Sequence, residues 1–284
     1  MEPTTPLEPP LPPTQAPHAP SAAPVGIADT RSVVIPDHGR ILAAELVGTA
    51  VLVLCGVGAI VLGDSSLGVL GISLSFGVAL LAMMYVIGPV SGCHLNPAVT
   101  LALLLAKRVN MKHATYAWIG QFVGAVLGAA LVYGIASGRD GWDRDAFGAN
   151  GWDRDGLNGL GSTIVVEILF TALLVVVMLV VTVRVLDAEV AGIAVGLTYA
   201  LAHLVTFTVD GTGINPARSL GSAVFADTDP NALGQLWAFI VFPMIGAVVG
   251  VVVWLLIDDS RLEETMLDTD FLRMARDKAD DAVD

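Results

Sequence analysis

Long apolar runs separated by short polar segments fill the chain from residue 41 to residue 257. Six of these runs hold almost no charged residues, and each has the ~20 residues that a helix needs to cross the hydrocarbon core of a bilayer. The pattern therefore predicts an all-α membrane protein with six transmembrane helices. The six runs are Ile41–Leu62, Ser66–Pro89, His113–Ser137, Gly161–Val183, Glu189–Val209 and Leu233–Ile257.

Two shorter apolar segments, Val99–Ala106 and Ser219–Phe225, each follow an Asn-Pro-Ala motif. A helix of about ten residues rises roughly 15 Å, which is half of the hydrocarbon core. Asn is a preferred helix cap and Pro suits the first helical position, so each motif predicts a helix start. We expect two re-entrant half-helices whose irregular lead-in segments line a wet cavity. The motif residues are Asn96, Pro97 and Ala98, and Asn215, Pro216 and Ala217.

The two motifs lie 119 residues apart, and aligning them reveals an internal repeat. Glu45 and Glu167 precede the Asn of their own motif by 51 and 48 residues. Gly77 and Gly196 both precede it by 19 residues. Each half has three spans, and an odd number of spans inverts the second half relative to the first. The half-helices then enter from opposite faces and meet near the midplane. We expect repeats at about 41–136 and 161–257, linked by an extracellular loop at 137–160.

Small residues recur every fourth position in two of the spans. Gly120, Gly124 and Gly128 do so in the third span, and Gly246 and Gly250 in the sixth. This spacing lets helix backbones approach closely, so it predicts tight helix packing.

Composition agrees with a membrane protein, because 55% of the residues are hydrophobic and only 14% are charged, against roughly 25% charged in soluble domains. Ten of the fifteen prolines lie in residues 1–37, which predicts a disordered tail. Residues 258–284 form a second, acidic tail outside the channel domain at 38–257. The net charge of −13 comes largely from this tail and the loop at 137–160. Nothing indicates a nucleic-acid partner, a cofactor or a metal site, and two cysteines make no disulfide framework.

Basic residues in short loops predict the orientation in the membrane. Lys107, Arg108 and Lys112 follow the first half-helix, and Arg184 follows the fourth span. We expect these loops and both termini in the cytoplasm, and the protein in a plasma membrane. The outer loop repeats the sequence Gly-Trp-Asp-Arg-Asp at 141–145 and 151–155, which we interpret as a duplicated surface turn.

Two helix N-termini that face each other carry roughly half a positive charge each and repel cations. If Asn96 and Asn215 cap through their carbonyl oxygens, their NH₂ groups stay free to donate into the pore. A water that accepts from both cannot continue a proton wire. This chemistry passes neutral solutes and excludes protons and ions.

The segments Ser91–Thr100 and Gly213–Ser219 resemble the signature loops of the aquaporins, the major intrinsic protein family. The resemblance covers about residues 40–257. It implies an aquaporin-like right-handed bundle in a lipid bilayer, and a homotetramer in which every subunit has its own pore with water as the permeant.

The resemblance also places a selectivity filter at Phe76, His203, Thr212 and Arg218, a set similar to that of bacterial water-selective members. Backbone carbonyls before each motif are then expected to line the pore, and His94 either lines it or braces the loop. The residues concerned are Gly92, Cys93, His94, Gly211 and Gly213. Two features depart from this branch, namely Asp210 near the outer mouth and the pair Phe239-Ile240.

Glu45 and Glu167 are costly at membrane depth. They either carry protons or accept hydrogen bonds from the re-entrant loop of their own half, and their symmetric placement favours this bracing role.

The sequence thus predicts a passive water channel that catalyses no reaction. One alternative is a channel that also passes glycerol or other small neutral solutes, against which His203 argues. An ion-coupled transporter is less favoured. An intramembrane hydrolase is weaker still, because neither His94 nor His203 has an evident nucleophile.

Overall fold

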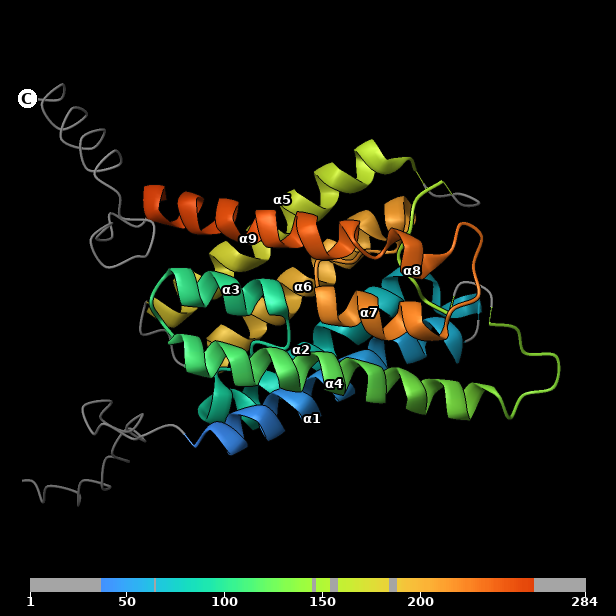
Figure 1. Ribbon diagram of the computed structural model, residues 1–284, viewed down its shortest axis with the longest axis horizontal. Coiled ribbons are helices and arrows are strands. Elements are labelled where there is room, and N and C mark those ends of the chain that lie inside the picture. The colour runs from blue at the N-terminus through green and yellow to red at the C-terminus, as the bar shows by residue number, and fades with distance from the viewer. Residues whose placement is uncertain (1–36, 64, 145–146, 154–157, 184–187, 258–284) are drawn as a thin grey trace, which may run out of the picture. The chain divides into compact units, whose positions relative to one another are not determined.

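Six long helices follow the six predicted spans closely in the computed structural model (Figure 1). The structure describes residues 37–63, 65–144, 147–153, 158–183 and 188–257. Within that part of the chain, six helices are long and apolar enough to cross a membrane. The fold class expected from the hydrophobic pattern is therefore confirmed. The long helices are α1 (His38–Val61), α2 (Gly68–Ser91), α4 (Met111–Ala136), α5 (Leu160–Val183), α6 (Ala188–Asp210) and α9 (Ala238–Ile257).

Short elements lead into two of the long helices, and a side-chain cap begins a third. A single 3₁₀ turn, η1 (Ser65–Leu67), leads into α2, and the short helix α8 (Ala232–Gln235) leads into α9. Asp37 caps α1 by accepting hydrogen bonds from the backbone N–H groups of Gly39 and Arg40. Arg184 and the predicted tails, 1–36 and 258–284, lie outside the described residues, so the expectations for them stay predictions.

Two half-helices, α3 (Pro97–Leu105) and α7 (Pro216–Phe225), begin at the prolines of the two motifs. They pack crosswise between the halves of the chain. Helix α3 lies against α9 of the second half as well as α4, whereas α7 lies against α4 and α1 of the first half. Because each half-helix packs on the other half, the two repeats interlock.

The long helices pack in pairs that repeat between the halves. Helix α1 runs along α4 and its counterpart α5 runs along α9 (Figure 1), while α2 packs against α6 of the other half. At that crossing a Cβ on Gly77 would lie 2.6 Å from the Gly196 carbonyl oxygen, and a Cβ on Gly196 would lie 2.8 Å from that of Gly77. The two glycines that share a repeat position thus contact each other.

Glycines set the spacing of the other pairs as well. A Cβ on Gly124 would lie 2.2 Å from the Leu46 carbonyl oxygen of α1. A Cβ on Gly246 would lie 2.6 Å from the Ile168 carbonyl oxygen of α5. Both distances are far below van der Waals contact, so only glycine allows these backbone approaches.

Gly124→Ala should therefore lower stability by at least about 1–3 kcal/mol, the typical cost of overpacking, because the new methyl group would meet backbone rather than a movable side chain. Gly134→Ala on the same helix is the matched control, since a Cβ there meets nothing within 4 Å. Thermal unfolding of both variants in detergent, followed by size-exclusion chromatography, tests this. Equal melting temperatures would contradict it.

Candidate functional site: a pore centred on two half-helix N-termini

Each half-helix is capped by the asparagine of its own motif. The Asn96 side-chain oxygen accepts a hydrogen bond of 2.9 Å from the Ala98 N–H. The Asn215 oxygen accepts from the N–H groups of Ala217 at 3.0 Å and Arg218 at 3.2 Å. These bonds satisfy N–H groups that have no partner inside the helix. They also fix each asparagine with its NH₂ group turned away from its own helix.

The two NH₂ groups hold the half-helices together. Asn96 Nδ2 donates to the Ile214 carbonyl at 2.7 Å, and Asn215 Nδ2 donates to the Leu95 carbonyl at 2.8 Å. The sequence led us to expect these groups to be free. Each NH₂ group instead donates one of its two hydrogens to the opposite lead-in segment. The second hydrogen of each group remains for a solute.

The backbone leading into each half-helix is left-handed at equivalent positions. Four, three and one residues before each motif asparagine, φ is positive, a region that non-glycine residues seldom adopt. Two of these residues, Thr212 and Ile214, are β-branched, for which the conformation is especially costly. The φ values are 84° and 79° at Gly92 and Gly211, 53° and 51° at Cys93 and Thr212, and 50° and 43° at Leu95 and Ile214.

A buried carboxylate holds each of these segments. Glu45 accepts hydrogen bonds from the His94 N–H at 2.9 Å and the Leu95 N–H at 2.8 Å. Glu167 accepts from the Gly213 N–H at 2.7 Å and the Ile214 N–H at 2.6 Å. Both glutamates are 0% exposed. The pairs of donors occupy the same repeat positions, two and one residues before each motif.

The first carboxylate has further partners. The Ser91 hydroxyl donates to Glu45 at 2.6 Å, and the Gln121 amide donates at 2.7 Å. Gln121 also donates to the Thr100 hydroxyl at 2.9 Å. Sequence reasoning did not single out Gln121, although a lone amide in the middle of an apolar span was a usable signal.

The four residues expected in the filter lie together. The Phe76 and His203 rings stack with centroids 4.1 Å apart, and the Arg218 guanidinium lies 5.3 Å from the Phe76 centroid. The Thr212 hydroxyl pairs with that of Thr206 at 2.9 Å. Phe76, His203, Thr212 and Arg218 are all 0% exposed. The cluster is therefore closely packed.

His203 is oriented by its own helix. Its Nδ1 lies 2.9 Å from the Tyr199 carbonyl oxygen, which can only accept, so Nδ1 carries the proton. In the neutral ring Nε2 is then an acceptor. His203 Nε2 thus offers an acceptor beside the Arg218 donors.

The Arg218 guanidinium is held by the outer loop. It donates to the Asn150 side-chain oxygen at 2.5 Å, to the Ser222 hydroxyl at 3.2 Å and to the Gly211 carbonyl at 3.1 Å. Asn150 also accepts from the Ser219 hydroxyl at 2.8 Å. Sequence reasoning missed Asn150, because an asparagine in a polar loop carries no signal that it reaches the core. Gly211, expected to offer its carbonyl to the lumen, gives it to Arg218.

The two copies of the duplicated loop sequence flank Asn150 along the chain, and the tryptophan of each copy packs on the protein. Trp142 packs edge-on against Tyr133 and Phe147, and Trp152 packs edge-on against Trp237. The Trp152 backbone also exchanges two hydrogen bonds of 3.0 Å with the Gln235 amide. The two copies of the sequence are thus not equivalent surface turns, because their tryptophans pack against different parts of the chain. Arg154 and Asp155 of the second copy lie outside the described residues.

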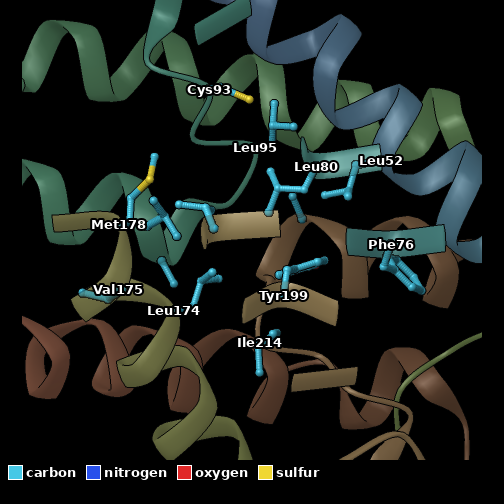
Figure 2. Packing of buried hydrophobic residues seen from close by; sticks show 14 of the residues in the cluster. Leu52, Phe76, Leu80, Cys93, Leu95, Leu174, Val175, Met178, Tyr199 and Ile214 are labelled. Atoms are coloured by element: carbon cyan, nitrogen blue, oxygen red, sulfur yellow. The ribbon is translucent and has the colours of Figure 1, made fainter. Parts of the chain in front are cut away.

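A small cavity lies beyond the filter, at the level of the motifs. Its free volume, about 10 Å³, is of the order that one water molecule needs. Cys93 and His94 line it, while the His94 Nδ1 lies 3.1 Å from the Thr100 hydroxyl. His94 therefore both lines the cavity and ties the loop to α3. Leucines from both halves complete the apolar wall, as Figure 2 shows for Leu52, Leu80, Leu95 and Leu174.

Six spans, two half-helices joined at their N-termini and a buried polar constriction define a multi-pass membrane protein built as a channel. Comparison with known proteins identifies which kind. The family model of the major intrinsic proteins matches residues 33–254. The chain belongs to the major intrinsic protein family.

Individual relatives agree with this assignment. Aquaporin Z of Brucella melitensis biotype 1 is 41% identical over 219 residues, which cover 75% of this chain and 95% of that protein. Aquaporin Z of Photorhabdus laumondii subsp. laumondii is 40% identical over 219 residues, covering 74% and 94%. The X-ray structure of the aquaglyceroporin from Plasmodium falciparum superposes with a TM-score of 0.69. It covers 78% of this chain and 100% of its own at 24% identity, and it shows a shared fold.

Glu167→Ala should destabilise the protein strongly. It leaves the Gly213 and Ile214 N–H groups buried without an acceptor, at about 1–3 kcal/mol for each, and it frees a strained segment. Asp227→Ala is the control, because the ion pair of Asp227 with Arg144 is exposed and worth at most about 1 kcal/mol. Melting temperatures in detergent should fall far more for the first variant. Equal, small shifts would show that Glu167 does not brace the loop.

Proposed function

We propose that this protein is a passive water channel that excludes protons and ions. The observation that carries the proposal is the filter, in which the stacked Phe76 and His203 rings face the Arg218 guanidinium with no exposed surface. Such a constriction suits a single file of water, which can accept from Arg218 and donate to His203 Nε2. The names of the Aquaporin Z relatives support the same substrate.

Charge exclusion follows from three positive features along one path. Arg218 supplies a full positive charge at the filter. The N-termini of α3 and α7, bonded to each other through Asn96 and Asn215, add roughly half a charge each. The remaining amide hydrogen of each asparagine donates to a central water and turns the hydrogens of that water outward, which interrupts a proton wire.

Several further assignments belong to this proposal. Glu45 and Glu167 act as braces of the re-entrant loops, and the carbonyls of Gly92, Cys93, His94 and Gly213 serve as acceptors along the path. Residues 38–257 form the channel domain, with both tails in the cytoplasm and the protein in the plasma membrane. The assembly is a homotetramer, as the family resemblance implies, with no chemical reaction at any site.

Stopped-flow light scattering on proteoliposomes tests the function directly. Shrinkage driven by an impermeant solute should be fast with a low activation energy, whereas re-swelling in glycerol should match that of empty liposomes. Rapid glycerol entry into wild-type liposomes would instead favour the broader neutral-solute channel. Water flux no faster than in empty liposomes would contradict the proposal.

Asn150→Ala should weaken selectivity while leaving water flux in place. Without the Asn150 oxygen, Arg218 loses its shortest hydrogen bond and its guanidinium gains freedom to leave the filter. Proton flux measured with an encapsulated pH dye should rise above the wild-type rate. Asn231→Ala, which removes only the cap of α8, is the control and should leave proton exclusion unchanged. A proton leak equal to wild type for Asn150→Ala would contradict the positioning role.

A further inference from the structure

Tyr199 is a buried polar residue that the filter and the two motifs leave unexplained. It lies on α6 four residues before His203, hence one turn or roughly 6 Å further along the helix on the same face. Its side chain is 1% exposed and lines the cavity that Asn96 and Asn215 also line. It therefore stands between the filter and the pore centre.

The tyrosine ring extends the aromatic constriction inward. Its centroid is 4.6 Å from that of His203 and 6.1 Å from that of Phe76, which it meets edge-on. Figure 2 shows Tyr199 between Phe76 and Leu174, with Leu80 and Leu95 across from it. The cavity that the ring and these leucines line has a free volume of about 10 Å³, which is of the order that one water molecule needs.

The hydroxyl group at the tip of this ring lacks a close hydrogen-bond partner. Among the residues that the structure describes, Tyr199 Oη makes no hydrogen bond. Burying a hydroxyl without a partner costs free energy, and the neighbouring wall residues Leu52, Leu80 and Leu174 offer none. The Asn215 side chain is close enough for a long, weak hydrogen bond with it, and the charge of Arg218 acts on it. The cavity that Tyr199 lines has room for about one water molecule, which would satisfy this hydroxyl.

We infer that Tyr199 is a second selectivity station of this channel, one helical turn beyond the filter. Its ring limits the width of the path, and its hydroxyl exchanges hydrogen bonds with water between Arg218 and Asn215. The inference rests on the proposed water conduction. It adds a specificity-determining residue to the path and predicts that opening the filter alone does not admit glycerol.

Four variants of the full chain in proteoliposomes test the inference. Tyr199→Phe removes only the hydroxyl, and Tyr85→Phe makes the same change on an outward-facing part of α2, where Tyr85 is 45% exposed. His203→Gly opens the filter alone, and His203→Gly combined with Tyr199→Leu opens both stations. Water and glycerol permeability per reconstituted channel, and the activation energy of water flux, are measured for each.

Tyr199→Phe should lower water permeability and raise the activation energy, because each passing water loses a hydrogen-bond partner, while Tyr85→Phe should match wild type. His203→Gly should stay closed to glycerol and the double variant should conduct it. Glycerol entry through His203→Gly as fast as through the double variant would overturn the width limit. Unchanged water flux and activation energy in Tyr199→Phe would overturn the role of the hydroxyl.

The experiment separates this inference from the function on which it rests. If wild-type protein passes no water, the proposed function fails. If wild type conducts water, Tyr199→Phe behaves like Tyr85→Phe and the double variant behaves like His203→Gly, only the second station fails. The Tyr199→Phe substitution keeps the ring and its packing, so a folding defect does not obscure the result.

Discussion

Two buried carboxylates hold the strained backbone on which the pore is built. Each lead-in segment needs left-handed residues, including β-branched Thr212 and Ile214, that would not adopt this conformation alone. Glu45 and Glu167 each compensate by accepting two hydrogen bonds from consecutive N–H groups. Since all four donors sit at matching repeat positions, the same device operates twice. The half-helices, their asparagines and the filter arginine take their positions from it.

This bracing also bears on the alternative of an ion-coupled transporter. A carboxylate that carries protons must release its partners in each cycle, and here the Glu45 partners include the backbone itself, together with Ser91 and Gln121. Protonation would remove acceptors from a segment that depends on them. The arrangement suits a rigid passage rather than a moving one.

The sequence predicted the spans and the half-helices of the fold, whereas part of the site depends on contacts between distant segments. Hydrophobic run length determines the spans, and the Asn-Pro pairs determine the helix starts at Pro97 and Pro216 to the residue, because capping is a local property. Asn150 could not be found in this way, since it reaches Arg218 only after the outer loop folds. The hydrogen bond of each asparagine to the opposite carbonyl was equally out of reach. It depends on how two distant segments meet, and no pattern within one segment records that.

The contact between Gly77 and Gly196 bears on how such a molecule could have arisen. The two glycines occupy one repeat position and approach each other's carbonyl reciprocally, as a residue on a two-fold axis meets its own copy in a symmetric dimer. A single half-chain that paired with itself in antiparallel orientation would place one glycine at this point, facing its twin. In such a dimer a larger side chain at this position would have clashed with its own symmetry copy. One substitution would therefore have destabilised the contact from both halves. A fused chain keeps that constraint although its two halves are free to diverge elsewhere.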